Sequence, residues 1–225
     1  STTRGDAPGF GSVVDRGAKG AIRPAAVNAG TIVEVRDLFT ATPARLKFLK
    51  SGRAESMAVM DIVRRLAMAH PSVSFTVQTG DKKPSHFPSE AATPEGLLNR
   101  LGVIMGREFM ADALEIAGGG SGASGPMRVF GFAGLPTLHR PDTTQQFLFV
   151  NGRPVRDRLL IGAVKAAYGD LIPKGRNPLL ALFLDVTPSD VDVNVHPTKA
   201  EVRFRDSGRV RGLMIGALAQ ALEAA

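Results

Sequence analysis

A chain of 225 residues with 44% hydrophobic content can bury one large core or two modest ones. It has no cysteine, which excludes disulfides and thiolate metal sites and fits a cytoplasmic protein, and its four histidines lack metal-ligand spacing. Its apolar runs are too short to cross a bilayer, and a formal net charge of +7 favours a polyanionic partner.

The first predicted elements follow a Gly- and Ala-rich stretch at the start of the chain. Alternation of valine with charged residues predicts a strand over Thr31–Val35. Thr42 can cap a helix and Pro43 is favoured at a first helical position, so we expect a helix from there to about Lys50.

A second helix is predicted over Ala54–Ala69, before a polar, proline-containing linker at Asp81–Ala92. The apolar residues of this helix recur at helical spacing and are expected to be buried: Val59, Ile62, Val63 and Leu66. The linker predicts a division into two domains, residues 1–92 and 93–225.

The second half of the chain alternates strands and helices. Thr93-Pro94 repeats the capping signal, and the glycine-rich run from Gly118 to Pro126 predicts a mobile hairpin loop. The other elements expected here are a helix to about Ile104, strands at Ala113–Ile116, Met127–Ala133, Gln146–Val150 and Leu180–Val186, and helices at Asp157–Leu171 and about Ser207–Leu222.

The stretch VDVNVHPTKAEVRF, Val191 to Phe204, reads as two strands joined by a turn. Its valines alternate with polar residues, and Pro197 ends the first strand because proline cannot donate to a sheet ladder. Lys199 then stands at the turn, where a mobile cation on a rigid base is suited to contact a phosphate; the alternative from these residues alone is an ordinary solvated lysine on a hairpin.

Two clusters of basic residues, at 45–65 and 153–176, are candidates for neutralising nucleic-acid phosphates. Arg153, Arg156 and Arg158 follow the Asn151-Gly152 turn and flank a helix start, and arginine suits bidentate phosphate contact. The alternative for these arginines is ion pairing with Asp157 or a solvated helix face. With no Trp and one Tyr, base stacking on single strands is the weaker hypothesis.

Three segments together resemble the MutL family of DNA mismatch repair ATPases, which belong to the GHKL superfamily. They are GTIVEVRDLFTATPARLKFLK, QQFLFVNGRPVRDRLL and VDVNVHPTKAEVRF, and the resemblance covers about Gly30 to Leu222. It implies an α+β fold: the rear part of a Bergerat-type ATPase domain over residues 1–92, then a two-layer α/β transducer domain of the ribosomal-protein-like fold over residues 93–225.

The resemblance also assigns candidate site residues. Lys199 matches the family lysine that reaches the γ-phosphate of ATP, and Gly30 and Thr31 match a Gly-Thr pair that approaches the phosphates. Arg158 matches a position in the family's proposed DNA-binding groove. No catalytic residue and no metal ligand is assigned.

The family's Glu–Asn helix, Asp-Gly-Gly-type loop and lid segment do not occur in this sequence. We therefore expect a fragment lacking the N-terminal part of the ATPase domain, inactive as an ATPase and binding no cofactor tightly. The full-length parent would bind ATP and Mg²⁺, dimerise, and act as an ATP-gated matchmaker. Its partners would be DNA, the mismatch-recognition protein MutS, and a downstream nuclease and helicase.

Two other functions remain open from the residues. One is the transducer region of another GHKL enzyme such as a type II topoisomerase, against which the HPTKAEVRF and TPARLKFL strings argue. The other is a ribosomal or RNA-binding protein of the same fold, which the basic composition favours. RNA binding that survives mutation of Lys199, with no link to ATP, would support it.

Overall fold

The computed structural model describes residues 2–3, 9–26, 28–122, 125–193 and 201–225, and the chain forms two compact units, 1–55 and 56–225. The first unit contains a four-stranded antiparallel sheet in the order β5-β2-β1-β6. Its strands are β1 (Thr2–Thr3), β2 (Gly9–Gly11), β5 (Arg23–Ala25) and β6 (Gly30–Thr31). Neither hydrophobic cluster of the protein includes a described residue of this unit.

A hairpin and a short helix complete the first unit. β3 (Val14–Asp15) and β4 (Ala18–Lys19) pair across Arg16 and Gly17, whose positive φ angles suit a two-residue turn. Two predictions overestimated element length here. The strand expected to reach Val35 ends at Thr31, and the helix expected to reach Lys50 is α1 (Pro43–Leu46). The Thr42 side chain makes no capping hydrogen bond.

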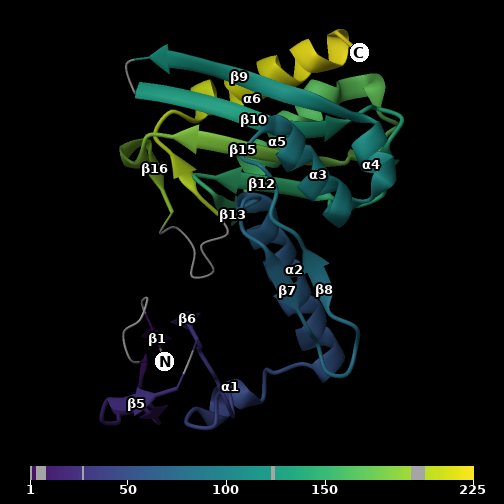
Figure 1. Ribbon diagram of the computed structural model, residues 1–225. Coiled ribbons are helices and arrows are strands. Elements are labelled where there is room, and N and C mark those ends of the chain that lie inside the picture. Colours follow the sequence, from purple (N-terminus) through teal and green to yellow (C-terminus); the bar gives the residue numbers. More distant parts are fainter. Residues whose placement is uncertain (1, 4–8, 27, 123–124, 194–200) are drawn as a thin grey trace. The chain divides into compact units, whose positions relative to one another are not determined.

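The second unit is built on a five-stranded sheet in the order β13-β12-β15-β10-β9 (Figure 1). β12 and β15 are parallel, and the other neighbours are antiparallel. Its strands are β9 (Ala113–Gly122), β10 (Gly125–Gly134), β12 (Gln146–Val150), β13 (Arg153–Val155) and β15 (Leu180–Val186).

One face of this sheet packs against α5 (Arg158–Tyr168) and α6 (Ser207–Glu223). Because side chains alternate along a strand, Leu148 and Val150 of β12 point into this layer and join the larger hydrophobic cluster. Leu182 of β15 does the same from the neighbouring strand. The sheet and these two helices form the two layers predicted from the sequence.

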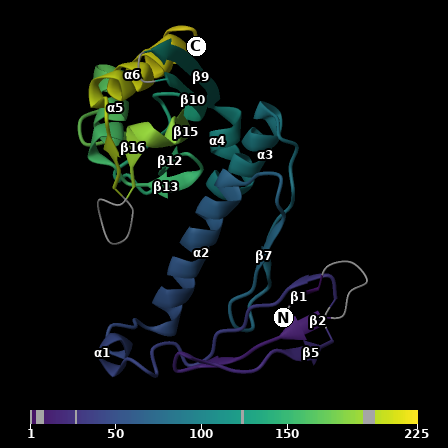
Figure 2. The same ribbon diagram turned by 90° about the vertical axis from the view of Figure 1, so that its left-hand side faces the viewer.

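The opposite face is also covered, so the unit has a third layer. Phe147 and Phe149 of β12 point to this side and belong to a second cluster. That cluster includes residues of α3 (Pro94–Met105), α4 (Arg107–Ala111) and the end of α2 (Gly52–Ala69). Figure 2 shows α5 and α6 on one side of the sheet and α3 and α4 on the other.

The fully buried Arg100 of α3 holds the segment before α3 in place. Its guanidinium donates hydrogen bonds to the carbonyl oxygens of Ala67 at 2.8 Å, Pro71 and Val73 at 2.9 Å each, and Pro88. Burial lowers the pKa of this guanidinium, and the nearby Glu90 carboxylate opposes the shift. Residues 56–92 therefore pack as part of the second unit. The domain boundary at residue 92, which the sequence predicted, stays a prediction.

Short elements connect and extend these layers. The β7–β8 hairpin precedes α3, β11 pairs with β14, and β16 pairs with β17. Their bounds, with those of two 3₁₀ turns, are β7 (Phe75–Val77), β8 (Ser85–Phe87), β11 (His139–Arg140), η1 (Gly169–Leu171), β14 (Asn177–Pro178), η2 (Pro188–Asp190), β16 (Val191–Asp192) and β17 (Arg203–Phe204).

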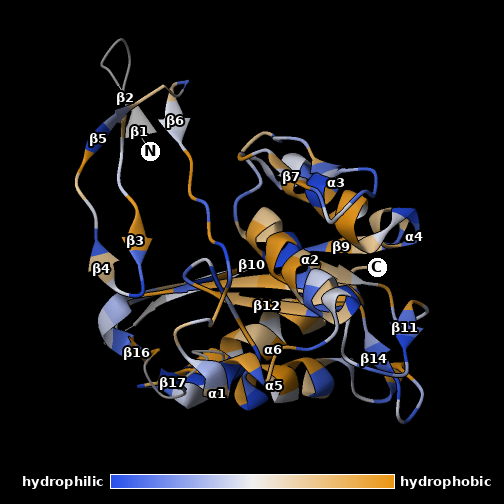
Figure 3. Ribbon diagram, turned by 90° about the horizontal axis from the view of Figure 1, so that it is seen from below, coloured by the Kyte–Doolittle hydropathy of each residue, from blue (hydrophilic) through white to orange (hydrophobic). Residues whose placement is uncertain are grey.

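The buried face of α2 differs from the predicted one. Its buried residues are Arg65, Ala67 and Met68, whereas Ile62 is 57% exposed and Leu66 is 38% exposed. Figure 3 shows hydrophobic residues along this helix. Helical spacing identified an apolar stripe, but the described residues of the second unit do not cover it. None of the helices in the described part of the chain combines the length and hydropathy needed to cross a bilayer.

The glycine-rich run was correctly predicted to form a hairpin, but its described residues are strands and not the mobile loop that was expected. Gly118 to Gly122 continue β9 and pair with β10, with Gly118 opposite Val129. The missing side chains allow α6 to approach closely, because a Cβ at Gly118 would stand 2.8 Å from the Cβ of Ala217. The guanidinium of Arg209 on α6 also donates to the carbonyl oxygens of Gly120 and Gly125, at 2.9 Å each.

Candidate nucleic-acid interface

Three exposed arginines lie on the short connection that leads from the edge strand of the sheet into α5. Arg153 is on β13, Arg156 is in the loop, and Arg158 is the first residue of α5. The intervening Val155 and Asp157 are both buried. The backbone is thus held against the core while all three guanidinium groups face solvent.

The turn before this connection is fixed to the centre of the sheet. Asn151 and Gly152 have φ angles of 48° and 74°, as a tight hairpin between β12 and β13 requires. The Asn151 side-chain oxygen accepts a hydrogen bond from the Val186 N–H at 2.9 Å, and the Asn151 N–H donates to the Leu184 carbonyl at 2.9 Å. The arginines therefore extend from a well-braced part of the fold.

Asp157 caps α5 instead of pairing with the arginines. Its Oδ1 accepts hydrogen bonds from the N–H groups of Leu159 at 2.9 Å and Leu160 at 3.1 Å. Within the described ranges, none of the three arginines forms an ion pair with a carboxylate. The ion-pair alternative considered from the sequence therefore does not hold for Asp157, and the connection carries three arginines against this one buried carboxylate.

Two other members of the predicted basic clusters make contacts inside the protein. Arg65 is buried, forms an ion pair with Asp61 at 2.9 Å, and lies over the ring of Phe147 at 4.9 Å from its centroid. Arg176 donates from Nε to Nδ1 of His139 at 2.8 Å. Arg65 is thus a packing residue of the second unit, which corrects its assignment to a phosphate-neutralising cluster.

The residues predicted to approach nucleotide phosphates fall in different parts of the chain. Gly30 and Thr31 form β6 in the first unit and are both exposed. Gly30 has a φ of +132°, and among the described residues of the first unit no atom is found within 4 Å of the place where a Cβ would stand, so its backbone is open to close approach there. Lys199 lies outside the described residues.

The comparisons with known proteins place this sequence among mismatch repair proteins. Residues 101–223 match the family described as "DNA mismatch repair protein, C-terminal domain". A DNA mismatch repair protein MutL of Phenylobacterium zucineum is 56% identical over 214 residues, covering 94% of this chain and 34% of the relative. The chain belongs to the MutL family.

Further MutL proteins agree with this assignment. The MutL of Beijerinckia indica is 54% identical over 212 residues, covering 94% of this chain and 33% of its own length. That of Paramagnetospirillum magneticum is 50% identical over 226 residues, covering 100% of this chain and 37% of its own length. The chain therefore spans about a third of the length of these MutL relatives.

Solved structures support the fold predicted from the MutL resemblance. The N-terminal domain of a DNA repair protein superposes with a TM-score of 0.76 at 20% identity, covering 99% of this chain and 70% of that one. The Aquifex aeolicus MutL ATPase domain complexed with ADP gives a TM-score of 0.59 at 21% identity, covering 90% of this chain and 65% of that one. The predicted α+β class is confirmed.

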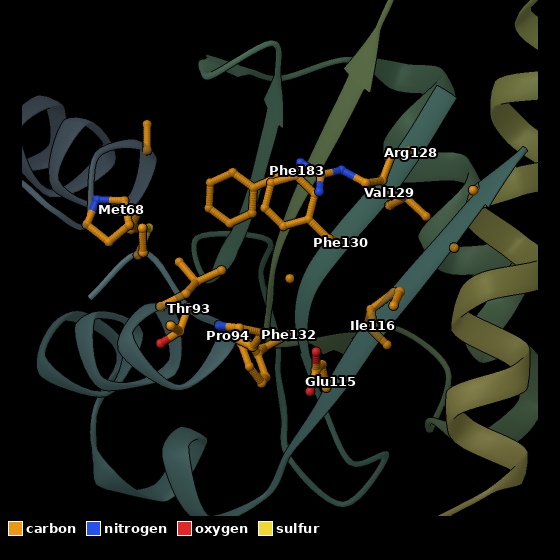
Figure 4. A pocket seen from close by; sticks show the side chains of 18 residues that line it. Met68, Thr93, Pro94, Glu115, Ile116, Arg128, Val129, Phe130, Phe132 and Phe183 are labelled. Atoms are coloured by element: carbon orange, nitrogen blue, oxygen red, sulfur yellow. The ribbon is translucent and has the colours of Figure 1, made fainter. Parts of the chain in front are cut away.

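A large cavity lies elsewhere in the second unit and was not anticipated from the sequence. It has a volume of about 790 Å³ between the sheet and the adjoining ends of α2 and α3. Phe130 stacks on Phe183 at one side of it, and Arg128 lies over Phe130 (Figure 4). None of the MutL site residues that the structure describes lines this cavity. Across the same ranges, no three His, Asp or Glu side chains converge as metal ligands.

Proposed function

We propose that this chain forms part of an ATP-gated matchmaker of the MutL type and contacts duplex DNA through Arg153, Arg156 and Arg158. The observation that carries the proposal is the exposure of all three guanidinium groups on one braced connection, with the adjacent Asp157 engaged as a helix cap. Guanidinium groups in this state are free to form bidentate contacts with phosphate oxygens.

The expected DNA contact is to the phosphate backbone. Phosphate contacts neutralise charge and release counterions, so the affinity depends on salt and hardly on sequence. Base stacking requires exposed aromatic side chains, and in the described part of the second unit, where the three arginines lie, no Phe or Tyr side chain is exposed. Duplex DNA of any sequence is therefore the appropriate ligand.

We propose that nucleotide binds in the full-length parent protein. ATP with Mg²⁺ would bind there, with the open backbone at Gly30 and the hydroxyl of Thr31 supplying part of the phosphate contacts. Lys199 would contact the γ-phosphate, which distinguishes ATP from ADP. A cation that touches only ATP favours one arrangement of the protein by its differential binding energy.

The partners of the parent belong to the same proposal. It would dimerise, receive a signal from the mismatch-recognition protein MutS, and act on a downstream nuclease and helicase. The support for this is the family membership and the high identity to proteins named for DNA mismatch repair.

The test is equilibrium binding of the 225-residue chain to a short labelled duplex of mixed sequence. Combined replacement of the three arginines by Glu should weaken binding at least tenfold, since three phosphate contacts become repulsive. The control carries the same charge change at other exposed cations of the second unit: Lys82, Lys83 and Arg107. Equal losses in the two variants would mean that net charge alone drives binding, which would contradict the proposed site.

A further inference from the structure

A second element meets the arginine-bearing connection at the start of α5. A depression of about 290 Å³ is formed where α5 begins, beside β17 and the first turn of α6. It is lined by Asp157, Arg158, Leu159, Glu201, Val202, Arg203, Phe204 and Ser207. Arg158 and Arg203, which are far apart in the sequence, therefore border the same surface feature.

The local structure of β17 orients Arg203 outward. Val202 and Phe204, on either side of it, are buried in the cluster that also contains the apolar residues of α5. Because alternate strand residues face opposite sides, Arg203 is exposed while its neighbours anchor the backbone. Pairing of β17 with β16, Phe204 opposite Val191, fixes the strand further.

Two outward guanidinium groups at this depression are available to an anionic ligand. Arg158 and Arg203 are exposed, and in the described part of the chain neither lies within ion-pair distance of a carboxylate. Of the two acidic residues that line it, Asp157 is buried and engaged with the N–H groups of α5. Glu201 is exposed, and the exposed Asp192 stands opposite Arg203 in the β16–β17 pair, so a polyanion would have to pass both carboxylates.

We propose that Arg203 contacts the same DNA backbone as Arg158, so that a duplex lies across the start of α5 and β17. This inference rests on the proposed DNA-binding function and extends its surface to a residue from a different element. The occupant is a run of phosphates rather than a single anion, because two outward guanidinium groups on separate elements suit successive backbone contacts.

The absence of cysteine from the sequence allows a direct test. A single Arg203→Cys variant of the 225-residue chain is labelled with a photoactivatable crosslinker and irradiated with a radiolabelled duplex. Arg158→Cys serves as the positive comparison. Arg107→Cys is the control, since α4 packs on the opposite face of the sheet from α5.

We expect crosslinks from positions 203 and 158, both suppressed by added salt, and none above background from position 107. Arg203→Gln should also reduce the slope of log K against log salt by about 0.9, the value for one lost contact to duplex DNA. Arg203→Lys, which keeps the charge, should restore most of the slope. Circular dichroism confirms that each variant is folded.

The outcomes separate the two claims. If wild-type chain binds duplex and position 158 crosslinks, but position 203 does not and Arg203→Gln leaves the salt slope unchanged, the inference about Arg203 is wrong and the proposed function stands. If position 158 gives no crosslink and the wild-type chain binds no duplex, the proposed function fails and the inference with it.

Discussion

Replacing Arg100 by Met should destabilise the second unit more than any single surface substitution. The buried guanidinium donates to the carbonyl oxygens of Ala67, Pro71, Val73 and Pro88, which come from the end of α2 and the segment around the β7–β8 hairpin. Methionine fills a similar volume but donates no hydrogen bond. The substitution therefore leaves the carbonyl oxygens without their partner and removes the link from this segment to α3.

The magnitude follows from the kind of bond that is lost. A hydrogen bond to a charged group contributes about 1.5–3 kcal/mol, and a buried polar group left unpaired costs about 1–3 kcal/mol. These contributions are not additive within one network, because the freed carbonyls can admit water. A total of about 3–5 kcal/mol is expected, as for other disrupted buried charge networks. That is a large share of the roughly 5–15 kcal/mol by which a domain is stable.

The assay is urea unfolding followed by circular dichroism, with Arg140→Met as the matched control. Arg140 pairs with Glu108 at 3.0 Å, and both side chains are substantially exposed. An exposed pair of this kind contributes about 0–1 kcal/mol. If Arg100→Met lowers the free energy of unfolding by no more than Arg140→Met does, the buried network is not what holds this segment.

Further predictions concern a titration, a close contact and the nucleotide. Burial raises the pKa of the Tyr168 hydroxyl, which donates to the Gly134 carbonyl at 2.6 Å. The neutral hydroxyl therefore stabilises the fold fully below about pH 10, the unfolded-state pKa of tyrosine, and this stabilisation is lost as the pH rises toward the folded-state pKa. Tyr168→Phe should therefore flatten the fall of unfolding free energy above about pH 10, and parallel curves for the two proteins would refute this. Gly118→Ala should cost about 1–3 kcal/mol in thermal or urea unfolding because its Cβ would clash with α6. Gly120→Ala should cost much less, since no atom of the described residues lies within 4 Å of the added Cβ, and equal costs would contradict the packing described. In the full-length parent, Lys199→Ala should reduce ATP affinity and turnover about ten- to a hundredfold, since one charge-assisted contact contributes about 1.5–3 kcal/mol. ADP binding should hardly change. Calorimetry that finds ATP and ADP binding weakened equally would exclude γ-phosphate sensing by Lys199.

Local signals predicted those elements whose boundaries depend on nearby residues. The Thr93 side chain accepts a hydrogen bond from the Gly96 N–H at 3.1 Å, and α3 begins at Pro94 as the sequence indicated. The Asn151-Gly152 dipeptide likewise marked its hairpin correctly. Caps and tight turns are determined within a few residues, so a sequence indicates where they form, although the Thr42 side chain makes no capping hydrogen bond.

Features that depend on distant partners were less accessible. The glycines of β9 form a strand because β10 supplies the backbone hydrogen bonds and α6 needs the space, and neither condition is visible in a low-complexity run. Arg100 was not recognised as a buried hub because its acceptors lie 12 to 33 residues earlier in the chain. Periodicity in α2 found an apolar stripe without indicating whether anything covers it.

The candidate site was predictable in its residue types and only partly in its geometry. The arginines after the Asn-Gly turn were identified from the sequence, but the role of Asp157 as a cap required the structure. A strand ending at Phe204 was predicted, but Arg203 was not singled out from the sequence. Its proximity to Arg158 could not be foreseen, because it results from the packing of β17 beside α5.

The most direct test of the central claim is the salt dependence of duplex binding by the 225-residue chain, with Arg153, Arg156 and Arg158 intact or all replaced by Gln. If each arginine contacts one phosphate, the slope of log K against log salt should fall in magnitude by about 2.7, three contacts at about 0.9 each. A slope that is the same for both proteins would show that these arginines do not contact DNA.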